Sequence, residues 1–180
     1  MSSYIKVMVT VSLFILAITA VGFKYSVDKN VFVVQDCLDA KTKDAAALMA
    51  LSLNGVDIES EIELVESLIK GAYNLGSFEE VTLYGRPNGD SQNLKMQNKK
   101  DVGENVLKNA FFELKASESF ASITLDGEIQ GKVLVKSDMK NAFEGLSESV
   151  LKILNLYLML AFGSIFILAV ILKTAMNNRK

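Results

Sequence analysis

The sequence predicts an α+β domain, with a small antiparallel sheet and helices, held between two transmembrane helices. Three observations lead to this fold class. Two long apolar runs without charged residues lie near the two ends of the chain, helical apolar patterns adjoin both runs, and the pair Asp126-Gly127 separates two segments of alternating character. The chain has 180 residues, so the part between the apolar runs is large enough for one domain with its own core.

The second apolar run, residues 153–172, is the clearest feature of the chain. It holds twenty residues without a charge, and Lys152 and Lys173 flank it. At a rise of about 1.5 Å per residue, a helix of this length crosses a hydrocarbon core of about 30 Å. A buried helix of a soluble protein is rarely apolar on every face over such a length. We therefore predict a membrane-spanning helix.

The first apolar run, residues 7–23, lies between Lys6 and Lys24 and is the predicted first transmembrane helix. The alternative is a cleaved signal peptide, because a basic residue, an apolar stretch and the small residues Ala20 and Gly22 fit that pattern loosely. Seventeen apolar residues are long for a signal peptide, and the helical pattern continues past Lys24, which favours a retained span. In either case the following domain is exported.

Charge is distributed unevenly along the chain. All 21 acidic residues lie in the predicted domain, residues 24–152, with 15 of the 19 basic residues, so this part carries a net charge of −6. In the two tails, residues 1–6 and 173–180, every charged residue is basic. Positive charge in short tails marks the cytoplasmic side of a membrane. We expect both termini in the cytoplasm and the domain outside it. The acidic domain argues against nucleic acid as a partner.

A helical pattern continues directly from the first span. Its apolar residues recur at spacings of four and three with only position 41 missing, which predicts one long helix to about Leu53. This seam, which packs either on a second copy of the chain or on its own domain, consists of Val27, Val31, Val34, Leu38, Ala45 and Leu48. Cys37, beside the seam, is the only cysteine, so it is either an inert thiol or an intersubunit disulfide.

The other elements follow from periodicity and turn residues. We expect a helix at residues 60–72, a strand at 78–84 and a weaker return strand at 94–97. A short amphipathic helix is expected at residues 105–114, and the two strands of a hairpin at 120–125 and 128–135. Asp126-Gly127 is the strongest hairpin signal in the chain. The pattern that begins at Met139 runs into the second span as one helix. By analogy, this order is typical of PAS-like extracytoplasmic sensor domains.

The residues that usually carry catalysis are missing. There is no histidine, no glycine-rich phosphate loop, no nucleophile elbow and no paired-cysteine metal motif. We therefore predict a protein that is not an enzyme and has no catalytic residue, cofactor or metal site. The acidic cluster Asp57, Glu59, Glu61, Glu63 and Glu66 lacks the spacing of a calcium loop, and it suits the start of a solvated helix.

Three segments resemble a known pattern. Residues 44–53, DAAALMALSL, are similar to a helix end that contains Asp-Ala-Ala followed by Ala-Leu-Ser-Leu. Residues 73–78, YNLGSF, are similar to an aromatic-Asp-x-Gly-aromatic junction that leads into a strand. Residues 120–135 are similar to the last hairpin of the same pattern. The chain thus resembles the LapD/MoxY N-terminal domain family of bacterial receptors for cyclic di-GMP and of some histidine kinases. The resemblance implies a PAS-like periplasmic domain in the inner membrane, a homodimer and signal transduction.

The last hairpin departs from the pattern of LapD-type receptors. In those receptors a Gly-Trp pair enters a periplasmic cysteine protease of the LapG kind, whereas this chain has no tryptophan and reads Asp126, Gly127, Glu128 at the same place. We expect these three residues to face a partner, without tight capture of such a protease. Family receptors also continue into cytoplasmic cyclase-like and phosphodiesterase-like or kinase domains. Such a domain is expected in a longer chain or in a neighbouring protein.

The leading functional hypothesis is a non-enzymatic transmembrane signalling module that relays a conformational change through its long helices as a dimer. The alternative is a structural two-span scaffold or accessory protein without a switch. Besides the second copy and the protein partners above, the expected partner is the lipid of the inner membrane.

Overall fold

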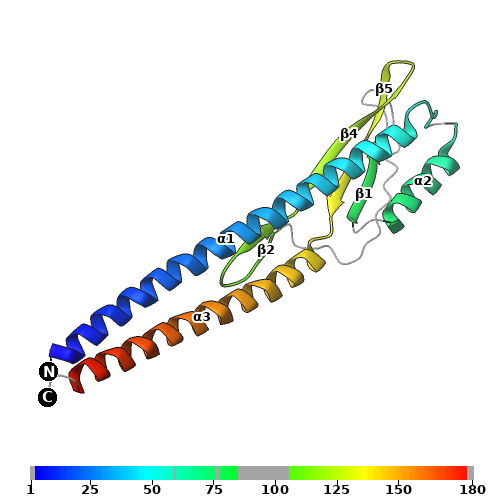
Figure 1. Cartoon of the computed structure of the whole chain (residues 1–180). Coiled ribbons are helices and arrows are strands. Elements are labelled where there is room, and N and C mark those ends of the chain that lie inside the picture. The colour runs from blue at the N-terminus through cyan, green and yellow to red at the C-terminus, as the bar shows by residue number, and fades with distance from the viewer. Residues whose placement is uncertain (1–2, 59, 76–77, 85–105, 178–180) are drawn as a thin grey trace. The chain divides into compact units, whose positions relative to one another are not determined.

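The computed structural model describes residues 3–58, 60–75, 78–84 and 106–177 (Figure 1). These residues form the helices α1 (Ser3–Leu53), α2 (Ile62–Leu75) and α3 (Met139–Asn177) and the strands β1 (Phe78–Tyr84), β2 (Val106–Lys108), β3 (Glu113–Lys115), β4 (Glu118–Leu125) and β5 (Glu128–Ser137). The predicted α+β class is confirmed. Both long helices are continuous as predicted, since α1 extends to Leu53 and α3 passes unbroken into the second apolar run.

The chain divides into two compact units. The helix-pair unit contains Met1–Val31, Ala110–Phe112 and Gly145–Lys180, and the sheet unit contains Phe32–Asn109 and Glu113–Glu144. The helices α1 and α3 each contribute residues to both units.

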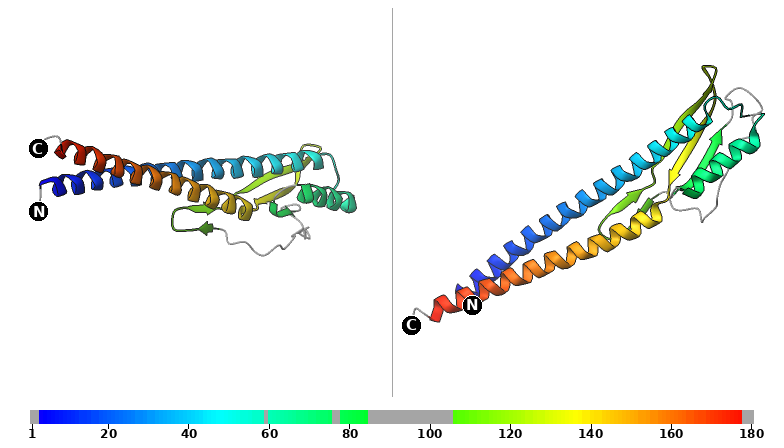
Figure 2. Two further views of the ribbon diagram at one scale, coloured as in Figure 1. Left: turned by 60° about the horizontal axis from the view of Figure 1, so that its bottom comes forward. Right: turned by 45° about the vertical axis from the view of Figure 1, so that its right-hand side comes forward.

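The sheet unit is built on a three-stranded antiparallel sheet of order β1-β5-β4. Side chains alternate across a strand, so Val133 and Val135 of the central strand share one face with their neighbours on β1 and β4. The sheet unit's part of α1 and the helix α2 supply the other side of the core (Figure 2). The buried residues of this core are Ala46, Met49, Ala50, Leu53, Ile58, Val65, Ile69, Val81, Leu83, Ile123, Val133 and Val135.

The helix predicted at residues 105–114 is wrong, because the described residues 106–115 form the hairpin β2–β3. Leu107 pairs with Leu114, and Lys108 lies opposite Glu113, which places opposite charges side by side. An isolated helix of ten residues is marginal in water, so its apolar spacing was a weak signal. The hairpin also gains an edge contact, since the Gln35 side chain donates to the carbonyl of Lys115 and accepts from its N–H, both at 3.2 Å. The return strand predicted near residues 94–97 lies outside the described residues.

In the helix-pair unit, α1 and α3 run antiparallel, with their outer ends together (Figures 1 and 2). The helices approach closely at Gly22, where an added Cβ atom would lie 2.9 Å from Cε1 of Tyr157. The hydroxyl groups of Tyr157 and Ser26 are hydrogen-bonded at 2.9 Å. Counting outward from this contact at equal rise, Lys6 comes level with Lys173, so both apolar runs end at the same height.

Two ion pairs lie just beyond the inner ends of the apolar runs. Lys24 pairs with Asp28 at 2.6 Å, and Lys152 pairs with Glu148 at 2.7 Å. The hydrogen bond from Lys152 and its positive charge hold the pKa of the Glu148 carboxyl below its usual range. Both pairs are solvent-exposed, so they add little to stability and mainly mark where polar residues begin.

The apolar runs expose large side chains almost everywhere. By length and composition, both α1 and α3 could cross a membrane, and within their most apolar windows 0% and 6% of the residues are buried. Exposed fractions reach 66% for Phe14, 71% for Val21, 74% for Met159 and 70% for Phe166. The core helix of a soluble protein would bury such side chains. These two helices are therefore candidate membrane spans.

Candidate functional site at the start of α3

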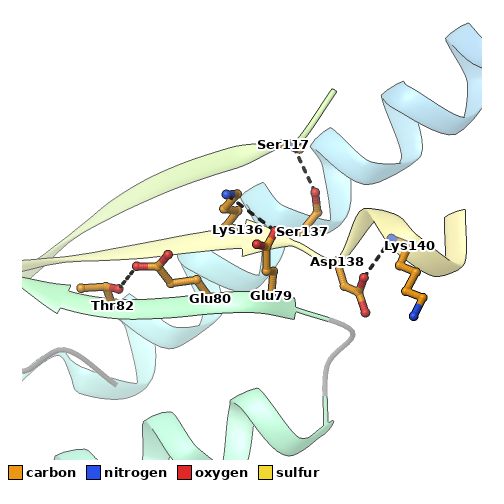
Figure 3. Close-up of polar contacts among 8 residues, drawn as sticks. All are labelled: Glu79, Glu80, Thr82, Ser117, Lys136, Ser137, Asp138 and Lys140. Atoms are coloured by element: carbon orange, nitrogen blue, oxygen red, sulfur yellow. Dashed lines mark hydrogen bonds and ion pairs between the residues drawn. The ribbon is translucent and has the colours of Figure 1, made fainter. Parts of the chain in front are cut away.

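The last helix begins where the central strand of the sheet ends. Strand β5 ends at Ser137, and α3 begins at Met139. The residue between them, Asp138, accepts a hydrogen bond from the N–H of Lys140 at 2.9 Å, as a helix N-cap does (Figure 3). This cap closes the first turn of α3 one residue after the end of β5.

A reciprocal pair of hydrogen bonds joins Ser137 to Ser117. The N–H of Ser137 donates to the carbonyl of Ser117 at 2.9 Å, and the N–H of Ser117 donates to Oγ of Ser137 at 3.0 Å (Figure 3). Both serines are buried. Because Ser117 immediately precedes β4, this pair continues the β4–β5 pairing to the point where α3 starts.

Thr42 of α1 joins the same group. Its Oγ1 lies 2.7 Å from Oγ of Ser117 and 3.0 Å from the carbonyl oxygens of Leu38 and Asp39. Either hydroxyl can be the donor of the bond between the two side chains, because each carries one hydrogen and can also accept. Thr42, Ser117 and Ser137, called the hydroxyl cluster below, connect α1 to the strand ends next to α3.

An ion pair lies beside the hydroxyl cluster. Nζ of Lys136 on β5 lies 3.6 Å from Oε2 of Glu79 on β1, and both side chains are largely buried (Figure 3). The register of β1 against β5 shifts between Phe78 and Glu80, at the position of this glutamate. Both charges are withdrawn from water, so their attraction is screened less than that of an exposed pair. The pair thus locks the end of β5 to β1.

A second attachment fixes the far end of α1 to β4. Oδ1 of Asn54 accepts hydrogen bonds from the N–H and the hydroxyl of Thr124 at 2.9 and 3.2 Å, and the N–H of Gly55 donates to the carbonyl of Thr124 at 3.2 Å. Gly55 has φ of +83°, a conformation that glycine adopts without strain and that ends the helix as predicted. Between Thr42 and Asn54, about 18 Å of helix is therefore tied to β4 at both ends.

The predicted hairpin at Asp126, Gly127 and Glu128 is confirmed. Asp126 and Gly127 have φ of 51° and 85°, so they form a two-residue turn with both central residues left-handed, and Glu128 pairs with Leu125. All three residues are exposed. Their role in binding a partner stays a prediction.

The predicted seam of α1 is placed unevenly. Val27 is buried in the helix-pair unit, whereas Val31, Val34, Leu38 and Ala45 are half-buried and Leu48 is 64% exposed. After Leu38 the buried line continues through Thr42, Ala46, Met49 and Leu53. A straight helix has 3.6 residues per turn, so a strict heptad line drifts away from the face that contacts the sheet. The dimer contact of the seam stays a prediction.

The hydroxyl cluster was missed because each member resembles an ordinary polar residue in the sequence. Thr42 interrupts an apolar stripe, and a threonine on a buried helix face can return its hydroxyl hydrogen to the preceding turn. The serine and aspartate at 137 and 138, directly before a helical pattern, were the one local signal of a helix start.

The described residues contain no group of three or more His, Cys, Asp or Glu side chains that could hold a metal ion. The side chains at the start of α3 are hydroxyl groups and one ion pair, all engaged in contacts within the sheet unit. This arrangement fixes the position of chain segments. A comparison with protein-family models and with curated protein sequences found no match.

Proposed function

We propose that this chain is a non-enzymatic transmembrane signalling module. Its PAS-like domain lies in the periplasm, both termini lie in the cytoplasm, and α1 and α3 cross a bacterial inner membrane. The module acts as a homodimer and relays a conformational change of the domain to a cytoplasmic cyclase-like, phosphodiesterase-like or kinase domain in a longer chain or a neighbouring protein.

The membrane arrangement is supported by exposure, length and charge. The two apolar runs expose large side chains and end at the same height, and the tails beyond them carry only positive charge. The contact of Gly22 and Ser26 with Tyr157 favours a retained first helix over a cleaved signal peptide, because cleavage would leave this surface of α3 uncovered. The resemblance to the LapD/MoxY N-terminal domain family supports the periplasm and the inner membrane.

The observation that carries the relay is the hydroxyl cluster. It joins Thr42 of α1 and Ser137, the last residue of β5, to Ser117 immediately before β4, so a shift of β4 against β5 acts on α1 and on the segment that leads into α3 within the sheet unit. Packed helices typically shift by about 1–2 Å in switching proteins, because well-packed contacts have discrete alternatives. A helix that is continuous from this cluster into a membrane span carries such a shift along its axis.

Distances between the outer ends of the two helices test the relay. In a Cys37→Ser background, spin labels on cysteines at Val7 and Ile171, both exposed, report this distance in nanodiscs. Thr42→Val disconnects the hydroxyl cluster, and we expect the distance distribution to shift or broaden by about 1–2 Å.

Ser52→Ala is the matched control. Ser52 lies on the same helix, is exposed, and donates its hydroxyl hydrogen to the Leu48 carbonyl of the same helix at 2.8 Å. This variant should leave the distribution unchanged. If the Thr42→Val variant folds and its distance distribution equals that of the parent protein, the relay is overturned and the structural two-span scaffold is favoured.

A further inference from the structure

The turn between β2 and β3 packs on the apolar helices. Residues Ala110–Phe112 belong to the helix-pair unit. The ring of Phe111 lies edge-on to the ring of Phe23, with 5.5 Å between centroids, and Phe23 also contacts Tyr157 edge-on at 6.2 Å. Phe112 is buried, whereas Phe111 is 38% exposed and Ala110 is exposed. An apolar turn thus contacts α1 at Phe23, the residue whose ring also contacts Tyr157 of α3.

This contact lies at the polar boundary of the apolar runs. Phe23 is the last residue of the first run, and the next residue, Lys24, begins the ion pair with Asp28. On α3, Tyr157 lies one helical turn inside the second run, whose boundary is marked by Lys152 and its partner Glu148. Phe111 is therefore at the height where a bilayer changes from head groups to acyl chains, if the runs span it.

We infer that the Ala110–Phe112 turn inserts into the head-group boundary of the bilayer and forms a third membrane contact beside the two spans. This inference rests on the proposed two-span arrangement. The occupant of the exposed Phe111 face is lipid, because this face continues the apolar surface of the helices up to the first charged residues. Phenylalanine is among the apolar side chains with which interfacial segments enter the boundary between head groups and acyl chains.

The sequence around the turn fits a lipid surface. Asn109 separates the turn from Lys108, and Glu113 and Leu114 separate it from Lys115; both lysines are exposed. Lys108 lies opposite Glu113 in the hairpin, and the long side chains of the two lysines can meet lipid phosphate while the apolar side chains of the turn enter the boundary. An aqueous loop of this length would more often be built from polar turn residues.

Tryptophan fluorescence tests the inference, because the chain has no tryptophan of its own. The full chain is placed in phosphatidylethanolamine–phosphatidylglycerol liposomes as three single-tryptophan variants, Phe111→Trp, Phe166→Trp and Phe120→Trp. Phe166 is 70% exposed on the second apolar run, and Phe120 is 60% exposed on β4. Quenchers are iodide in water and lipids with nitroxide groups at shallow or deep positions of the acyl chain.

We expect a blue-shifted emission for Phe111→Trp, quenched by the shallow lipid nitroxide and protected from iodide. Phe166→Trp should be quenched by the deep nitroxide, and Phe120→Trp by iodide alone. Iodide quenching of Phe111→Trp equal to that of Phe120→Trp would overturn the inference while Phe166→Trp still reports a span. Protection from all quenchers would also overturn it, since a protein then covers the ring. Absence of lipid quenching for Phe166→Trp would overturn the two-span proposal as well. Ala110→Trp replaces Phe111→Trp should that variant fail to fold.

Discussion

The side-chain oxygens of Thr42 and Ser117 lie 2.7 Å apart, and both residues are buried. The two residues come from α1 and from the segment before β4, 75 positions apart in the chain. A buried polar contact is costly unless both groups are satisfied, and here four further hydrogen bonds complete the hydroxyl cluster around Thr42 and Ser117. A substitution in the hydroxyl cluster therefore affects α1, β4 and β5 together.

Thr42→Val should lower the free energy of unfolding of the full chain by about 1–3 kcal/mol, because it leaves the buried Ser117 hydroxyl without its partner. Thr42→Ser keeps the hydroxyl and should lower it less. Thermal unfolding in detergent micelles, followed by circular dichroism, measures both variants against Ser52→Ala. Equal stability of Thr42→Val and the parent protein would show that the contact adds nothing.

Gly131→Ala should be among the most damaging alanine substitutions in the sheet. A Cβ atom at Gly131 would lie 2.6 Å from the carbonyl oxygen of Tyr84, a backbone atom that cannot rotate away. We expect a loss of about 1–3 kcal/mol in the free energy of unfolding, from overpacking and displacement of β1 against β5. The matched control is Gly145→Ala, where nothing lies within 4 Å and a better helix former replaces glycine. An unaffected Gly131→Ala variant would contradict the close approach of these strands.

Gly22→Ala should weaken the packing of the two apolar helices. The new Cβ atom would push on the Tyr157 ring and separate its hydroxyl from Ser26, at a cost on the order of 1 kcal/mol. In a Tyr157→Leu background the same substitution should cost less, so the two changes are non-additive in a double-mutant cycle. Gly163→Ala, with nothing within 4 Å, is the control on the other helix. Additive effects would mean that the two positions do not interact.

Elements that a long apolar run or a short turn motif marks could be predicted from the sequence. The two long helices follow from apolar runs and from the helical periodicity that adjoins them, and the β4–β5 hairpin follows from Asp126-Gly127, whose turn requires two left-handed residues. The β2–β3 hairpin could not be predicted in this way. Its apolar spacing fits a helix, and the edge contact with Gln35 that favours the strand comes from a residue 80 positions away.

The candidate site was less predictable than the fold. Hydrogen bonds among Thr42, Ser117 and Ser137 depend on how three distant segments meet, and no local pattern encodes that meeting. The heptad seam shows the opposite case, because its spacing was regular yet its last member, Leu48, is exposed. A heptad spacing has an average period of 3.5 residues, which keeps apolar residues on one face only when two helices supercoil around each other. The face of α1 that packs on the sheet follows the 3.6-residue period of an ordinary α-helix.

The proposed dimer can be tested through Cys37, which is exposed on α1. Oxidation in the membrane should give a crosslinked dimer, and Leu48→Glu should abolish it, because burying an unpaired charge in the contact costs several kcal/mol. Leu48 suits this test better than Val34 or Leu38, which are half-buried within the chain, so that charges there would also disturb the fold. A Cys37→Ser/Lys43→Cys variant places the thiol elsewhere on the exposed helix surface. Equal crosslinking from both positions would indicate random collision.

The last prediction concerns the hairpin tip at Asp126, Gly127 and Glu128. If the tip is the partner-facing element, its two carboxylates favour a basic or polar partner surface, and the parent protein should not hold a LapG-like protease tightly. An inserted tryptophan is a typical hot spot, worth about 2 kcal/mol or more, which corresponds to roughly a thirtyfold change in affinity. Glu128 is exposed and directly follows the turn, so Glu128→Trp restores an aromatic anchor without disturbing the two left-handed residues. In a pulldown against such a protease, we expect binding by Glu128→Trp and none by the parent or by Glu128→Ala. Tight binding by the parent protein would show that this anchor is dispensable, and equal binding by Glu128→Ala and Glu128→Trp would show that only removal of the charge matters.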